Sequence, residues 1–329
     1  MDYHSIYKTE TPEFLSRLCD TPPLQRLKDV GMNCGCEYTA LPRFAGVERY
    51  TRFEHSLGAA LIVWRFTRDE AQAAAALLHD VATPVFAHVV DFLRGDYLEQ
   101  TATESGTAGI IRESAELGAA LRELGLRPED VEDYHCFPVA DNDPPRLSAD
   151  RLDYTCGNAV NFSLASREEL SALLDDLRVG RNEDGETELV FQHGEKAARF
   201  AWIALDCSRI YVCDADRYAM QRLSELLRDA LAAGVLCERD LGSTERAVVG
   251  KLCADPASAG EWAAFRALSR TERAPRADER EGWRKISAKK RRIDPFVAGR
   301  GRVSALDGAF AAALSAFMNE DHDYFVRGE

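Results

Sequence analysis

Apolar residues recur at helical spacing along most of this chain, and one short stretch alternates as a strand does. In RYTRFEHSLGAALIVWRF, residues 49–66, the apolar positions share one helix face: Leu57, Ala60, Leu61 and Trp64. Further helical patterns cover residues 69–88, 104–124, 167–178 and 196–233. Residues 180–193 contain a turn signal followed by alternating polar and apolar residues, which predicts a β-hairpin. The sequence therefore predicts an all-α, mainly helical fold with one small β-hairpin.

The chain shows no internal repeat and no flexible linker. Its 329 residues are enough to bury a core without disulfide or metal staples. We expect one mainly helical core over residues 1–240, which includes the hairpin, and a C-terminal helical extension over 241–329 packed on that core. Pro84 should end or kink the second long helix just after Asp80.

Charge and hydropathy exclude several classes of protein. The net charge of −14 opposes general binding of nucleic acid, because the phosphates would be repelled. The longest apolar runs are far shorter than the roughly 18 to 20 residues that span a bilayer, and the first residues lack a signal pattern. Nine cysteines, an odd number in a long chain, are typical of free thiols. We therefore expect a cytoplasmic protein without a membrane partner.

One local exception to the acidic balance is the run RKISAKKRRIDPFVAGRGR, residues 284–302. It carries eight basic residues and one acidic residue. Such a run is suited to holding polyphosphate or an acidic partner surface, but a solvated charged face is the more usual explanation of it.

The chemistry of the chain centres on the pair His79-Asp80 in LLHDVATP. Imidazole and carboxylate together suit a divalent cation such as iron, manganese, zinc or nickel. His55 lies 24 residues upstream, which is the length of one helix out and another back, so two antiparallel helices would bring it to His79. Asp150, near the start of a later helix, is a candidate fourth ligand. Taken alone, His55 is also explained as a buried structural histidine.

The order His, His-Asp, Asp resembles that of the HD-domain metal-dependent phosphohydrolases. Five segments are similar, in order, to signatures of the branch that contains the deoxynucleoside triphosphate triphosphohydrolases: TPPLQRL (21–27), RFEHSLG (52–58), LLHDVATPVFAH (77–88), DRLDY (150–154) and RRIDPFV (291–297). The resemblance covers about residues 1–240 well and the rest thinly.

The resemblance implies a metal site and the groups around it. The implied metal ligands are His55, His79, Asp80 and Asp150, around one divalent transition metal (Fe, Mn, Ni, Zn or Co). Arg52 and Arg151 match positions that touch substrate phosphates, where cations neutralise charge. His88 matches a histidine near the scissile phosphate, Asp91 an acid that assists it, and Tyr154 an aromatic residue of the sugar pocket.

Some positions depart from the family pattern. Thr83 and Thr103 stand where family members usually carry histidines, so an acid-base group is missing. Glu104, together with Asp91, or else His88, is the candidate to move the proton in its place. Met32 replaces a sugar-contacting glutamine, and Asn158 replaces an aspartate that reads the 3′-hydroxyl, which makes Asn158 a candidate substrate-binding residue.

From these residues we expect a metal-dependent phosphohydrolase that cleaves a phosphoester or phosphoanhydride of a nucleotide or related phosphate, with a deoxynucleoside triphosphate as one candidate substrate. A nucleoside monophosphate is another. The alternative is a metal-containing, nucleotide-sensing regulatory protein without turnover. The resemblance also leaves a homo-oligomer open.

Overall fold

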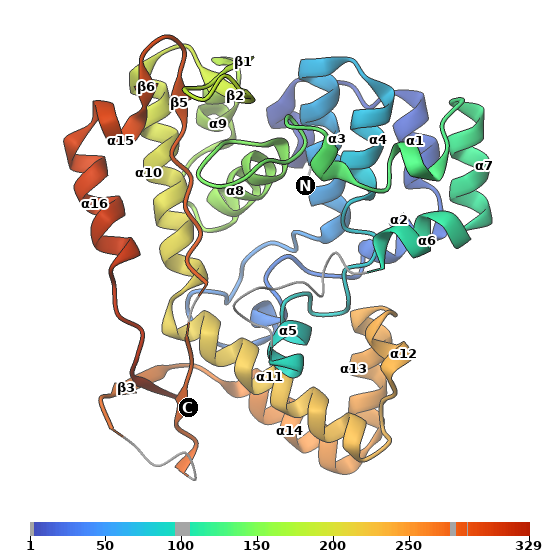
Figure 1. Ribbon diagram of the computed structural model, residues 1–329. Helices are drawn as coiled ribbons and strands as arrows, with labels where there is room; N and C mark the ends of the chain where they lie inside the picture. Colours follow the sequence, from blue (N-terminus) through green and yellow to red (C-terminus); the bar gives the residue numbers. More distant parts are fainter. Residues whose placement is uncertain (1–2, 96–105, 277–280, 288) are drawn as a thin grey trace.

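The computed structural model describes residues 3–95, 106–276, 281–287 and 289–329, and its ribbon is shown in Figure 1. The chain is 56% helix and 8% strand, so the expectation of a mainly helical fold is confirmed. The helices of the first half are α1 (Glu13–Cys19), α2 (Pro22–Leu27), α3 (Arg52–Thr67), α4 (Glu70–Leu78), α5 (Val89–Arg94), α6 (Thr107–Glu113), α7 (Ala115–Glu123) and α8 (Ala149–Asn161).

The second half adds helices of very different lengths: α9 (Arg167–Leu174), α10 (Gly194–Tyr211), α11 (Asp214–Ala232), α12 (Glu238–Leu241), α13 (Glu245–Ala254), α14 (Pro256–Ala267), α15 (Val303–Leu306) and α16 (Gly308–Met318). Short 3-10 turns are η1 (Tyr3–Tyr7), η2 (Cys36–Tyr38), η3 (Pro128–Asp130) and η4 (Tyr134–Cys136). The predicted long helix at 104–124 is divided, because Ser114 ends α6 and its side chain caps the start of α7.

The predicted hairpin is present, but it is part of a larger sheet. Strands β1 (Leu177–Arg181) and β2 (Thr187–Phe191) pair antiparallel, and β2 pairs in parallel with β5 (Phe296–Val297), which in turn pairs with β6 (Gly301–Arg302). A second sheet joins β3 (Thr271–Ala274), β7 (Phe325–Gly328) and β4 (Arg284–Lys285). The expectation of a single hairpin is therefore wrong, because strands of two to four residues carry too little periodicity to be detected.

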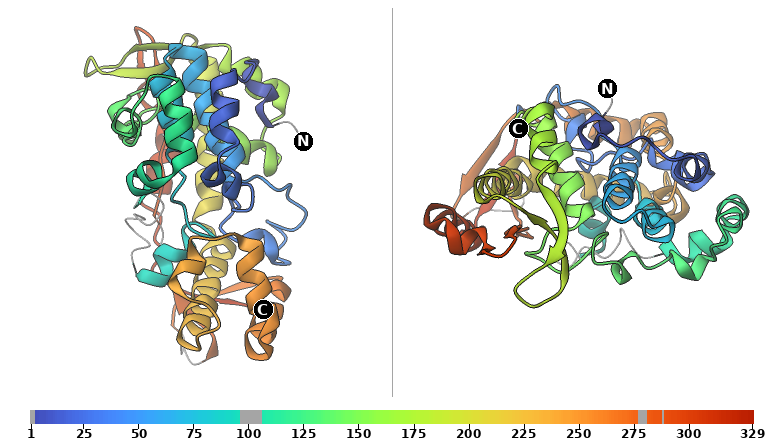
Figure 2. Two further views of the ribbon diagram at one scale, coloured as in Figure 1. Left: turned by 90° about the vertical axis from the view of Figure 1, so that its right-hand side faces the viewer. Right: turned by 90° about the horizontal axis from the view of Figure 1, so that it is seen from above.

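Buried side chains form two hydrophobic cores. One core joins α1, α3, α4, α8 and α10, and the other is built around α11, α13 and α14 with residues 85–92. Figure 1 shows these helix groups in two halves of the molecule, and the side view in Figure 2 shows the same division. The connection from α10 to α11 runs between the halves.

Residues after 240 contribute to both cores. Trp262 and Phe265 of α14 belong to the core around α11, whereas Phe310 and Phe317 of α16 belong to the core around α3 and α8. The strand β5 and helix α16 lie along α10 (Figure 1). The division at residue 240 stays a prediction.

Within the described ranges 3–95, 106–276, 281–287 and 289–329, none of the helices combines the length and the apolar character that crossing a lipid bilayer requires.

Candidate active site

Helix α3 begins at the candidate site because Thr51 caps it. The Thr51 hydroxyl accepts a hydrogen bond from the backbone N–H of Glu54, and the Glu54 carboxylate accepts one from the backbone N–H of Thr51. A short antiparallel bridge between Gly31 and Thr51 fixes the approach to the helix. This arrangement places Arg52 and His55 in the first turn of α3, where the sequence pattern predicts His55.

His55 is held by a buried carboxylate that the sequence pattern does not single out. Its Nδ1 donates to Asp153 Oδ2 at 2.7 Å, and Asp153 also accepts hydrogen bonds from the hydroxyls of Tyr50, at 2.5 Å, and Tyr7. Gly58 makes room for this carboxylate, because a Cβ there would lie 1.8 Å from Asp153 Oδ1. The Nε2 atom of His55 therefore faces Asp150 Oδ1, at 3.0 Å, and in a neutral ring it is the atom that carries the lone pair.

Helix α4 ends at Leu78, two residues before the predicted end at Asp80, and the His79-Asp80 pair follows it directly. His79 Nδ1 donates to the carbonyl of Ala76 at 2.7 Å, which leaves its Nε2 as the acceptor. The two oxygens of Asp80 have different partners: Arg52 Nη1 donates to Oδ2 and Thr83 Oγ1 donates to Oδ1, both at 2.8 Å. Thr83 therefore fixes a carboxylate at the position where a family histidine was expected.

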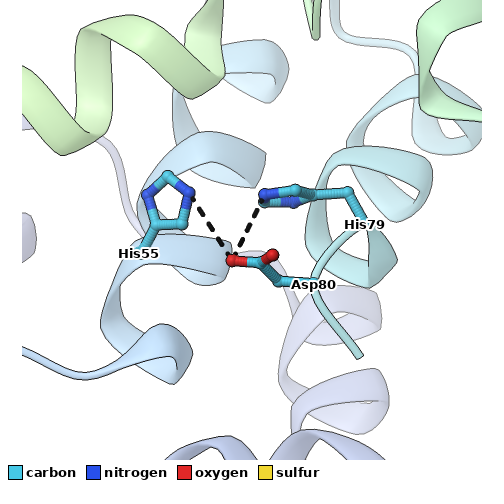
Figure 3. Close-up of side chains that lie close together, drawn as sticks. All are labelled: His55, His79 and Asp80. Atoms are coloured by element: carbon cyan, nitrogen blue, oxygen red, sulfur yellow. Dashed lines mark ion pairs between the residues drawn. The ribbon is translucent and has the colours of Figure 1, made fainter. Parts of the chain in front are cut away.

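Three of the four predicted ligands come together in one buried cluster, drawn in Figure 3. Donor atoms of His55, His79 and Asp80 all lie within 4.8 Å of one another. Asp80 Oδ2 is 3.8 Å from His55 Nε2 and 3.6 Å from His79 Nε2 (Figure 3). The fourth candidate, Asp150, places its Oδ1 at 3.0 Å from His55 Nε2 and 3.6 Å from His79 Nε2.

This geometry fits a cation. With both Nδ1 atoms donating elsewhere, neutral imidazoles would turn their Nε2 lone pairs toward the carboxylate oxygens of Asp80 and Asp150. Two acceptors at 3.0 Å repel each other unless a positive charge, either a proton or a metal ion, lies between them. Two imidazoles and two carboxylates are ligands that suit iron, manganese, zinc, nickel and cobalt.

The pKa shifts of His55 and Asp80 also favour positive charge in this cluster. Burial lowers the pKa of His55, but its hydrogen bonds with Asp150 and Asp153 outweigh burial and raise the pKa to about 10. Burial raises the pKa of Asp80, but the charges of Arg52 and His79 outweigh it and hold that pKa well below its usual range. The carboxylates are thus held ionised beside groups that carry or accept positive charge.

His88 and Asp91 form a dyad beside this cluster. His88 Nδ1 donates to Asp91 Oδ2 at 3.0 Å, and the Asp91 side chain is fully buried at the start of α5. Burial, together with the charges of Arg291 and Arg52, lowers the pKa of His88 to about 4, although Asp91 acts in the opposite direction. His88 is therefore neutral near pH 7 and presents an Nε2 lone pair, as a general base requires.

A cavity of about 270 Å³ connects these groups. Its walls include Arg52, His55, His79, Asp80, His88, Tyr134, Asp150, Tyr154, Asn158, Tyr211, Asp216 and Arg291. Asn158 donates to the Tyr211 hydroxyl at 2.8 Å, and its buried Oδ1 has no hydrogen-bond partner among the described residues. The predicted substrate residues Arg52, Tyr154 and Asn158 therefore share a cavity with the metal ligands.

Arg151, a predicted substrate-binding residue, is engaged by protein groups. Its guanidinium contacts the loop before α8, where it pairs with Asp141 at 3.2 Å and donates to the carbonyl of Arg146 at 2.8 Å and to Asn142. These contacts tie the side chain to the loop. The expectation that Arg151 touches substrate phosphate stays a prediction.

Glu104 and Thr103 lie outside the described residues, so the substitute acid predicted at Glu104 has no structural account. Two other contributors were missed. Asp153 lies within DRLDY, yet only the fold places it behind His55. Arg26, within TPPLQRL, donates to the carbonyls of Val81 and Thr83, both at 2.8 Å, and so supports the turn after Asp80.

Comparisons with known proteins fit a phosphohydrolase. The chain matches no model of a known protein family. It is 27% identical over 301 residues to the metal-dependent phosphohydrolase cns2 of Cordyceps militaris, covering 87% of this chain and 81% of that protein. It is 25% identical over 242 residues to the uncharacterised protein YdhJ of Bacillus subtilis, covering 72% and 70% of the two chains.

Solved structures share the fold. A phosphohydrolase from Bacteroides thetaiotaomicron has a TM-score of 0.65 at 14% identity, with coverage of 97% of this chain and 96% of the other. A hypothetical protein from Aquifex aeolicus has a TM-score of 0.62 at 20% identity, with coverage of 92% and 90%. Together with the His-His-Asp cluster, the relative named as a metal-dependent phosphohydrolase supports a bound metal and a general phosphohydrolase function.

Proposed function

We propose that this protein is an HD-type phosphohydrolase that uses one divalent transition metal to cleave a phosphoester or phosphoanhydride bond of a nucleotide or related phosphate. The observation that carries the proposal is the cluster of His55, His79 and Asp80 at a cavity that also contains the His88–Asp91 dyad. A deoxynucleoside triphosphate is one candidate substrate and a nucleoside monophosphate another.

The metal would be held by His55, His79, Asp80 and Asp150. When bound, a divalent ion supplies a Lewis acid for a phosphoryl oxygen and lowers the pKa of water at its open positions. Second-sphere bonds keep the ligands in place: Asp153 orients His55, the Ala76 carbonyl orients His79, and Thr83 orients Asp80.

The protein's own groups account for the other needs of the reaction. The neutral Nε2 of His88 accepts a proton from the attacking water, and Asp91 stabilises the imidazolium that results. Arg52, which is 7% exposed and bound to Asp80, lies where its positive charge offsets charge that develops on the phosphoryl oxygens. Asp91 thus takes the orienting role that the family resemblance implies for it.

The test is a screen of the protein loaded in turn with manganese, iron, nickel and cobalt. Nucleoside tri-, di- and monophosphates and simple phosphate esters are supplied, and released triphosphate, pyrophosphate and phosphate are measured separately because each reports a different bond. Asp80→Ala and His79→Ala should abolish product. His193→Ala, which removes an exposed histidine bonded to Asp176, should retain the wild-type rate.

A nucleotide sensor is the second candidate, favoured by Thr83. Its hydroxyl is bonded to Asp80 and offers no group for proton transfer at that position. Loss of an acid-base histidine typically lowers a rate by about 10²- to 10⁴-fold. Tight nucleotide binding without product from any metal form would favour the sensor and contradict the hydrolase.

A further inference from the structure

Residues 286–287 and 289–292 lie at one side of the cavity, and we call them the strap. Ser287, Lys289 and Arg291 line the cavity. Two other strap residues are fastened elsewhere: Ile286 is buried in the core around α11, and Lys290 Nζ donates to the Met318 carbonyl at 2.8 Å.

Arg291 is the strap residue that reaches the reacting groups. Its Nη2 donates to His88 Nε2 at 3.3 Å, which is the atom that should accept the proton from water. Its charge is also felt across the cavity, because it opposes the effect of burial on the pKa values of Tyr154 and Tyr211. A phosphoryl group beside His88 would therefore meet this guanidinium.

The remaining cations near the metal ligands are engaged differently. Arg52 is bound to Asp80 on the α3 side of the cavity, and Arg151 is directed into the loop at residues 141–146. Of the other cations that line the cavity, Arg217 is bonded to Asp214 and to the Ile286 carbonyl, and the strap supplies Lys289 and Arg291. Arg291 approaches from the strap, and a guanidinium donates in a planar fork that matches phosphoryl oxygens.

We propose that Arg291 is a phosphoryl-binding residue of this site, in the role that the family resemblance implies for Arg151. The inference rests on the proposed function. In the free protein the guanidinium contacts His88. When a phosphate group enters, Arg291 binds a non-bridging oxygen and leaves the His88 lone pair available for the proton.

The experiment compares Arg291→Ala with Arg292→Ala, a matched control on the next residue, whose side chain is exposed. Binding of inorganic phosphate is measured by calorimetry on the full-length protein as purified and after loading with manganese. Arg291→Ala should weaken phosphate binding by about 10- to 100-fold, the value of one or two charge-assisted hydrogen bonds. Arg291→Lys should recover part of the loss, and Arg292→Ala should bind phosphate as the wild type does.

Arg151→Ala is the contrasting variant, in which stability rather than phosphate binding should change. It should lower the melting temperature, because it releases the loop before α8, while the fraction that remains folded binds phosphate normally. Circular dichroism and thermal melts establish whether each variant is folded. The proposal is overturned if Arg291→Ala binds phosphate as tightly as wild type, if Arg151→Ala loses phosphate binding without loss of stability, or if the wild type binds no phosphate.

The outcomes separate this inference from the proposed function. If the wild type hydrolyses nothing in the screen but Arg291→Ala still loses phosphate binding, the hydrolase proposal fails and the inference stands. If the wild type turns over a substrate and Arg291→Ala matches it in KM, kcat and phosphate binding, the inference alone fails.

Discussion

At the scale of single residues, the absence of a side chain at Gly58 makes room for the carboxylate that orients His55, a candidate metal ligand. Gly58 lies one turn after His55 on α3, and the Asp153 carboxylate fills the space that a Cβ would occupy. Gly58→Ala should displace this carboxylate and lower the free energy of unfolding by about 1–3 kcal/mol, as overpacking of a full site does. Denaturant titration measures the change.

Gly250→Ala is the control for that substitution. Gly250 is in the interior of α13, and nothing lies within 4 Å of the Cβ that alanine would add. Alanine there should stabilise the protein by about 0.5–1 kcal/mol, because it favours the helix without meeting a neighbour. Equal effects at the two glycines would contradict the role assigned to Gly58.

His88 makes a prediction about pH and stability. Its pKa falls from the ordinary 6.5 to about 4 in the folded protein because it is buried and faces Arg291 and Arg52. Between these two pH values the unfolded chain binds more protons at His88 than the folded chain does. The contribution of neutral, buried His88 to stability is therefore fully present above pH 6.5 and declines as the pH falls toward 4. Unfolding free energies measured from pH 7 to 4.5 should fall less steeply in His88→Gln than in the wild type.

At the scale of elements, α2 supports the turn that carries Asp80. Arg26, at the end of α2, donates to the carbonyls of Val81 and Thr83 and, at 3.2 Å, to that of Ser243 before α13. Arg26→Ala should weaken manganese binding about tenfold, as losses in the second sphere of a metal do. Lys28→Ala, an exposed neighbour on the same helix end, should leave manganese affinity unchanged in calorimetry.

The extent to which the sequence predicted these elements follows from their length and partners. Helices α3 and α4 carry strong periodicity, and the motifs on them bring His55, His79 and Asp80 together as expected. The short strands β3 to β7 have too little periodicity to be predicted, and the strap was noticed only as part of the basic run 284–302 and of the segment RRIDPFV. Asp153 and Arg291 lie in quoted segments but were not selected, because only the fold shows that they contact His55 and His88. The partners of the Arg151 guanidinium lie in a loop that its motif does not include.

At the scale of the whole molecule, the C-terminal residues join the two cores. Ile286 belongs to the core around α11, whereas Ile293, Val297 and Phe310 belong to the core around α3 and α8. The two cores should therefore unfold together. Circular dichroism and tryptophan fluorescence should report one coincident denaturant transition, and two separated transitions would contradict this coupling.

The 3-10 turn η1 supports the candidate metal site, because the Tyr7 hydroxyl donates a hydrogen bond to Asp153, the carboxylate behind His55. A shortened chain that starts after η1 would leave the carboxylate behind His55 with one phenol instead of two, although it keeps every predicted ligand. Preparations trimmed at this end should therefore bind metal less firmly than the full chain while retaining an intact ligand set, so domain boundaries chosen by motif alone would misrepresent the protein.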